Sequence, residues 1–167
     1  GEHLEKAAIV LDDLKCPFII NQNRYSIFDR TIENNGLKNT AEKLGKGIIA
    51  FSPLAQGMLT DRYLNGIPCD SRVKKDGRFL KENALTKERI MQIEQLNALA
   101  EERGQSLAEM ALAWVLKDHS VTSVLIGASK PSQILDNIRA IQNTSFCEEE
   151  LEKIENIYLM NPDYTTR

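Results

Sequence analysis

The chain has 167 residues, of which 42% are hydrophobic and 27% charged, the balance of an ordinary globular domain. Its net charge of −3 argues against a protein that coats nucleic acid, and its longest apolar stretch, at residues 111–116, is far too short to span a bilayer. The start lacks a signal-like pattern and the three cysteines are widely spaced, which predicts a cytoplasmic protein without a disulfide framework.

The first half of the chain alternates between helical and strand-like patterns. Apolar residues recur at helical spacing over residues 4–14 and again over residues 37–44. Each of these segments is followed by a short apolar run, at residues 18–20 and 47–51. Continuous apolar runs of this length predict strands that are buried on both faces.

The second half continues the alternation with more helices. Ser106 and Glu109 have the spacing of a capping box, which predicts the start of a helix. Pro131 suits the first turn of a helix. The three glutamates at residues 148–150 would lie in the first turn of another helix, where their negative charges interact favourably with the positive end of the helix dipole. The predicted elements are helices at 90–104, 106–115, 131–141 and 148–158, with a third strand at 123–126.

Strands that alternate with helices predict a parallel sheet with right-handed crossovers. Three such strands leave both edges of the sheet open, and strands of this apolar kind tolerate exposed edges badly. The sequence therefore predicts that the chain pairs with another chain or forms part of a larger closed sheet.

A long segment without clear periodicity, residues 52–85, separates the second strand from the next helix. Within it, residues 60–81 carry six basic and three acidic side chains, a local charge of +3 in an acidic chain. Long loops inside compact domains are often functional. Two interpretations stay open: a basic lid over an anionic ligand, or a solvated loop whose charges only keep it soluble.

Ligands of parallel α/β proteins bind at the carboxyl ends of the strands, so the residues at these three ends are the candidates for a binding site. Residues 20–25 supply adjacent carboxamides, which suit a planar amide or carbonyl ligand or form a simple turn. Residues 51–57 combine an aromatic ring with small residues that let backbone N–H groups approach an anion. Residues 126–131 lead into a helix N-terminus beside Lys130, a weak phosphate signal because every α/β protein has such termini.

Catalytic groups are scarce at these strand ends. His3 and His119 lie outside all of them, no cluster has metal-ligand spacing, and no serine stands in a nucleophile elbow. Neither a dinucleotide-binding glycine fingerprint nor a phosphate-binding P-loop is present. The residues predict a binding site without an obvious acid, base or nucleophile.

Three motifs, at residues 21–26, 49–60 and 125–137, give the chain a specific resemblance along nearly its whole length. The chain is similar to the C-terminal half of an aldo-keto reductase, in the branch of glyceraldehyde-3-phosphate reductases and potassium-channel β subunits. The resemblance implies an α/β fold that is the C-terminal portion of a (β/α)8 TIM barrel, with strands six to eight, incomplete as given. It implies one partial barrel over residues 1–167, with 52–85 covering the cofactor and 147–160 forming an accessory helix.

The resemblance also implies NADPH as the cofactor and roles for individual residues. Gln22 would bind the nicotinamide carboxamide and Phe51 would stack on the nicotinamide ring. The pyrophosphate would lie along Ser52, Leu54, Gln56 and Gly57, with Arg62 reaching the same phosphates. The adenosine would contact Ser129, Gln133, Asp136 and Asn137, and Lys130 would contact the 2′-phosphate, which favours NADPH over NADH.

The family's catalytic Asp, Tyr, Lys and His have no counterparts in this chain, and neither Tyr25 nor Tyr63 stands in the matching motif. The resemblance therefore implies a fragment of a reductase of small carbonyl compounds that is inactive alone, with no nucleic-acid or membrane partner. The alternative is a non-catalytic nucleotide-binding or interaction module, completed by a second copy or by the missing N-terminal half. A third interpretation, an unrelated flavodoxin-like domain, predicts a bound flavin and is disfavoured by the motifs.

Overall fold

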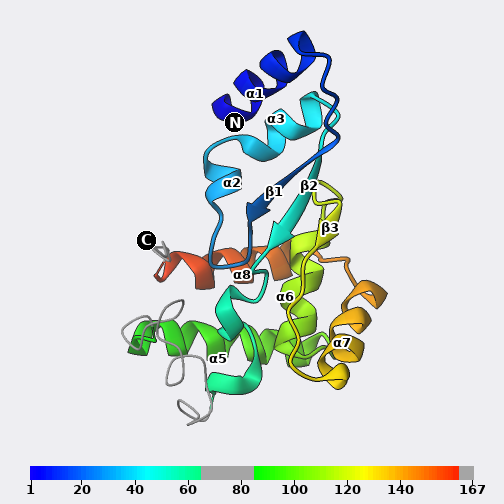
Figure 1. Ribbon diagram of the computed structural model, residues 1–167. Coiled ribbons are helices and arrows are strands. Elements are labelled where there is room, and N and C mark those ends of the chain that lie inside the picture. The colour runs from blue at the N-terminus through cyan, green and yellow to red at the C-terminus, as the bar shows by residue number, and fades with distance from the viewer. Residues whose placement is uncertain (65–84, 162–167) are drawn as a thin grey trace.

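The computed structural model describes residues 1–64 and 85–161 of the chain (Figure 1). Helices and strands alternate in the predicted order, with short 3₁₀ helices between them. The elements are α1 (Glu2–Asp13), β1 (Ile20–Arg24), α2 (Thr31–Asn34), α3 (Leu37–Lys43), β2 (Gly47–Phe51), η1 (Ala55–Gly57), η2 (Asp61–Tyr63), α5 (Lys87–Glu102), α6 (Leu107–Leu116), β3 (Ser123–Val124), α7 (Pro131–Ile138), η4 (Arg139–Gln142) and α8 (Glu148–Leu159).

The strands form one parallel sheet in the order β1-β2-β3, as predicted for an α/β chain. β1 pairs with β2 over its whole length, from Ile20 opposite Gly47 to Arg24 opposite Phe51. β3 is shorter, and the backbone N–H of Leu125 extends its ladder by donating to the Ala50 carbonyl at 2.8 Å. Because the strands are parallel, the segments that follow them emerge at the same end of the sheet.

The prediction of strands buried on both faces is wrong for β1 and β2. Ile48 and Ala50 are fully buried toward the helical side, where α2, α3 and α6 contact the strands, but Ile49 and Phe51 on the other face are only partly covered. Ile19, from the expected first strand, is 79% exposed, and β1 begins one residue later. The described residues cover only one face of this sheet.

The principal core lies where α5, α6 and α8 pack together beneath the sheet (Figure 1). Ile93, Leu96, Met110 and Ile154 are completely buried there. The capping box predicted for α6 is confirmed: Glu109 donates its N–H to Ser106 Oγ at 3.2 Å, and its carboxylate accepts the Ser106 N–H at 2.7 Å. The acidic first turn predicted for α8 is also confirmed.

Large apolar side chains remain exposed in two groups that belong to the two outer strands and their neighbouring helices. We call them the β1-side patch and the β3-side patch. The β1-side patch consists of Ile9, Val10, Leu14 and Ile19, and the β3-side patch of Leu125, Ile126, Ile134, Leu135, Ile138 and Ile141. Exposed apolar residues that gather into a patch usually mark an interface.

Within residues 1–64 and 85–161, no helix combines the length and the apolar character needed to cross a membrane.

Candidate functional site

The register of β1 and β2 places two of the predicted cofactor residues on one face of the sheet. Gln22 lies opposite Ile49, and Phe51 lies opposite Arg24 two residues further along. Residues that are paired across strands, or two apart on one strand, project from the same face. Gln22 is exposed and Phe51 half-buried, so both can be reached from the uncovered side. Gln22 lies within the strand rather than in a turn after it, which removes the simple-turn interpretation.

The turn after β2 holds an unusual backbone. Ser52, Ala55 and Gln56 all have positive φ angles, of 55°, 47° and 62°, and Gly57 follows at 95°. Each non-glycine residue in this region costs on the order of 1–3 kcal/mol, and such conformations cluster at functional sites. Internal contacts hold the turn: Gln56 Nε2 donates to Ser52 Oγ at 3.1 Å, and the Gly57 N–H donates to the Leu54 carbonyl at 2.8 Å.

Arg62 follows this turn on the short helix η2. Thr60 caps that helix by accepting the Arg62 N–H at 3.3 Å, and the buried Tyr63 anchors it to the core. The Arg62 residue itself is exposed. The basic segment, interpreted either as a lid or as a solvated loop, runs mostly through residues 65–84, which lie outside the described residues.

The third group of predicted residues lies at the start of α7, beyond β3. The Gln133 carboxamide oxygen accepts hydrogen bonds from the Ser129 N–H at 2.8 Å and from the Lys130 N–H at 3.2 Å. Gln133 therefore caps the helix from within, while the whole Lys130 residue is exposed. One predicted ligand-binding side chain, Gln133, thus also caps the helix.

Asp136 and Asn137 lie further along α7, where Asn137 is buried. Asp136 forms an ion pair with Arg139 at 2.7 Å, and Arg139 also donates to Glu109 of α6 at 2.8 Å. Burial opposes ionisation of Glu109, but hydrogen bonds from Ser106 and Arg139 outweigh it and hold the pKa of this carboxyl below its usual value. This network fixes α7 against the capped end of α6.

Sequence reasoning assigned no role to Arg24, the last residue of β1. Its guanidinium carbon lies 5.6 Å from the centroid of the Phe51 ring. Arg24 lines a small hollow together with residues of both strand ends, namely Ser26, Asp29, Ser52, Ala55 and Gln56. The sequence did carry a signal for Arg24: residues two apart on a strand project from the same face, so Arg24 shares the face of Gln22.

Next to Arg24, the side chain of Tyr25 points into the interior and is fully buried. Its hydroxyl donates to Glu33 and accepts a hydrogen bond from Lys117 Nζ at 3.1 Å. Burial, together with the charge of Glu33, raises the pKa of the Tyr25 hydroxyl. Burial, together with the charge of Lys38, lowers the pKa of Lys117 to about 8. This cluster joins the end of β1 to the end of α6, and its tyrosine is not exposed to solvent.

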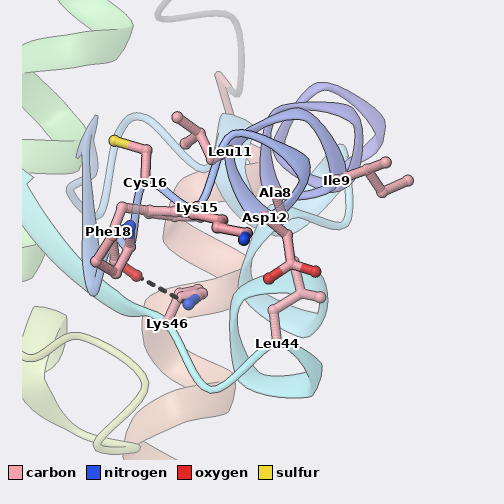
Figure 2. A pocket seen from close by; sticks show the side chains of 10 residues that line it. Ala8, Ile9, Leu11, Asp12, Lys15, Cys16, Phe18, Leu44 and Lys46 are labelled. Atoms are coloured by element: carbon pink, nitrogen blue, oxygen red, sulfur yellow. Dashed lines mark hydrogen bonds between the residues drawn. The ribbon is translucent and has the colours of Figure 1, made fainter.

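A larger hollow of about 560 Å³ lies at the opposite end of the strands (Figure 2). It is bounded by α1, the end of α3 and the segment before β1, and none of the predicted cofactor residues lines it. Lys46 spans its floor by donating to the Phe18 carbonyl at 2.8 Å (Figure 2). The hollow lies beside the free edge of β1, close to Ile9 of the β1-side patch.

Comparison with known proteins supplies the context for this geometry. Residues 1–159 match the sequence model of the Aldo/keto reductase family. The chain is 45% identical over 157 residues to L-glyceraldehyde 3-phosphate reductases of Escherichia coli O157:H7 and of Escherichia coli strain K12, covering 92% of this chain and 45% of each relative. A glycerol dehydrogenase structure from Gluconobacter oxydans superposes with a TM-score of 0.68 at 28% identity, over 89% of this chain and 46% of that one. The chain thus spans less than half the length of these proteins.

Proposed function

Because the chain belongs to the aldo/keto reductase family, we propose that the carboxyl ends of its strands bind NADPH as part of an enzyme that reduces a small carbonyl compound by hydride transfer. One observation carries the proposal. Gln22 and Phe51 lie on the same uncovered face of two paired strands, and the strained turn of residues 52–57 follows directly. An amide, an aromatic face and a preformed turn suit the nicotinamide end of a dinucleotide.

The cofactor-binding roles follow from this placement. The Phe51 ring would support the nicotinamide ring, and the Gln22 carboxamide would exchange hydrogen bonds with the nicotinamide carboxamide. The pyrophosphate would lie along Ser52, Leu54, Gln56 and Gly57, within reach of Arg62. The adenosine would meet the start of α7, and exposed Lys130 would favour the 2′-phosphate of NADPH.

The catalytic residues of the reaction are proposed to lie outside this chain, in the part of the relatives that it does not span. Tyr25 has a lysine partner but is enclosed in the core, so it cannot give a proton to a substrate. Hydride transfer to a carbonyl needs such a proton donor. The chain would therefore act as the C-terminal, cofactor-binding portion of a (β/α)8 barrel in the cytoplasm, and the relatives' name makes L-glyceraldehyde 3-phosphate one candidate substrate.

A second candidate function is a nucleotide-binding or interaction module completed by another polypeptide. The β1-side and β3-side patches favour it, because they expose large apolar side chains along both open edges of the sheet. The two candidates share the NADPH site and differ in whether the completed protein reduces aldehydes.

Titration with NADPH, followed by nicotinamide fluorescence, tests the shared part. We expect saturable binding that is tighter for NADPH than for NADH. The variant Phe51→Ala should weaken binding by about 1 kcal/mol, roughly fivefold, because it removes one stacking face. The matched control Phe18→Ala removes a ring from the hollow at the other end of the strands and should leave the affinity unchanged.

Three results would contradict this proposal: no NADPH binding by the wild-type chain, equal effects of Phe51→Ala and Phe18→Ala, or aldehyde-dependent NADPH oxidation by the pure chain. The last result would contradict only the placement of the catalytic residues.

A further inference from the structure

Arg24 stands at the carboxyl end of β1, on the face that carries the site. Its backbone is paired with that of Phe51, and it lies two residues after Gln22 on the same strand. The guanidinium lies over the Phe51 ring, 5.6 Å from the centroid, and the residue is only partly exposed.

This guanidinium has no anionic partner within residues 1–64 and 85–161. Asp29 lines the same hollow but forms no ion pair with Arg24; its Oδ1 accepts hydrogen bonds from the Thr31 N–H at 3.2 Å and from Thr31 Oγ1 at 2.8 Å. Other partly buried arginines are paired: Arg30 with Glu155, and Arg103 with Glu150 at 2.6 Å. Arg24 therefore differs from Arg30 and Arg103, because a partly enclosed arginine without a carboxylate partner is costly.

The hydrogen-bond donors of Arg24 are available to a ligand. None of its five N–H donors forms a hydrogen bond or ion pair within residues 1–64 and 85–161, and its guanidinium lies 5.6 Å from the Phe51 centroid. These donors form a fork that matches two oxygens of a phosphate or a carboxylate. Arg24 therefore offers an anion-binding group beside the Phe51 ring.

We propose that Arg24 binds the anionic group of the substrate, the phosphate or carboxylate of a small carbonyl compound. This rests on the proposed function, which places the nicotinamide ring on Phe51. The reacting carbonyl must lie beside that ring, and an anionic group a few bonds away then falls within reach of Arg24. The phosphates of NADPH are the other possible source of an anion, and the experiment distinguishes the two.

The test uses glycerol 3-phosphate as an unreactive probe, with glycerol and inorganic phosphate as comparisons. Each is titrated into the chain with and without saturating NADP⁺, by calorimetry and by the side-chain Nε–H resonance of Arg24, which is assigned from its loss in Arg24→Lys. We expect glycerol 3-phosphate to bind and shift this resonance, inorganic phosphate to compete, and glycerol to do neither.

Three variants distinguish a direct contact between Arg24 and the anion from an effect of net charge. Arg24→Gln should weaken glycerol 3-phosphate binding roughly tenfold or more, because a charge-assisted forked contact is lost. Arg24→Lys should recover part of the affinity, since it keeps the charge without the fork. Lys6→Gln removes an exposed charge on α1 and should change nothing. Circular dichroism and thermal unfolding verify that each variant is folded.

Titration of the same variants with NADPH shows whether Arg24 binds the anion of the substrate or that of the cofactor. NADPH affinity should change less than about twofold in Arg24→Gln, a free-energy difference below about 0.5 kcal/mol. The proposal is overturned if this variant weakens NADPH instead of glycerol 3-phosphate, or if glycerol binds as tightly as its phosphate. If the wild-type chain binds no NADPH, the proposed function fails. A shift of the Arg24 resonance on adding glycerol 3-phosphate to the free chain would still support an anion site there, and no shift would contradict it.

Discussion

The helical side of the molecule and the edges of its sheet use large apolar residues in opposite ways. Between α5, α6 and α8, side chains such as Leu96 and Ile154 are completely buried. At the edges, Ile19, Leu135 and Ile141 are exposed by 79%, 64% and 66%. The helical side therefore provides its own core, whereas the edges carry surface that another set of strands and helices would bury.

Truncating one leucine in each region sharpens this comparison most. Leu96→Ala should lower the free energy of unfolding by about 2–5 kcal/mol, because it leaves a cavity in a closed core. Leu135→Ala, the same change in the β3-side patch, should cost no more than about 0.5 kcal/mol in the isolated chain. Urea denaturation measures both, and similar losses would show that the edge is already covered in solution.

The hydrogen bond between Tyr25 after β1 and Lys117 at the end of α6 makes stability depend on pH. The pKa of Lys117 is about 8 in the folded chain and near 10.5 when unfolded, so between these values the unfolded state binds more protons. Stability should therefore rise with pH, by on the order of 1–2 kcal/mol from pH 7 to 9.5.

Urea unfolding at the two pH values, compared between the wild type and Lys117→Met, isolates this effect. The increase should disappear in Lys117→Met and persist in Lys6→Met, which removes an exposed lysine of α1. Measurements stop at pH 9.5 because tyrosines of the unfolded chain ionise near pH 10. An identical pH dependence in all three proteins would contradict the assignment.

Self-association of the chain tests whether the exposed edges of the sheet form an interface between copies. If the β3-side patch is buried between copies, Ile138→Lys should weaken association by roughly tenfold, about 1.4 kcal/mol, because a charge replaces a buried side chain. Met91→Lys is the matched control, since Met91 is exposed to nearly the same degree, 48% against 51%, but lies on the helical side. Sedimentation velocity across a concentration series measures both variants, and equal effects would remove the patch as the interface.

The sequence predicted most elements because their signals are local. The Ser106–Glu109 capping box and the apolar spacing of α5 depend only on neighbouring residues, and both are confirmed. α2 was missed because it has only four residues, although the Asp29 carboxylate accepts the N–H of its first residue, Thr31. β1 was placed too early because the apolar residues at 18–20 resemble a buried strand, whereas pairing with β2 selects Ile20–Arg24.

The candidate site was predictable in its residues but not in its shape. Gln22 and Phe51 were named from the motifs, and their common face follows from the register, which is a property of the sheet. The positive φ angles at Ser52, Ala55 and Gln56 were not predicted, because residue types other than glycine rarely adopt such a conformation. Arg24 was overlooked because its unpaired state becomes visible only when its surroundings are known.

The strand register also bears on the order in which the site assembles. Ile20 pairs with Gly47, whereas Ile49 pairs with Ser123, so β3 closes a loop nearly three times as long as the one between β1 and β2. The entropy of closing the longer loop is greater by about 1 kcal/mol. We therefore expect the β1–β2 unit, with Gln22 and Phe51, to form before β3 docks and brings Lys130 with it. In kinetic terms, the nicotinamide end of the proposed site would precede the adenosine end during folding.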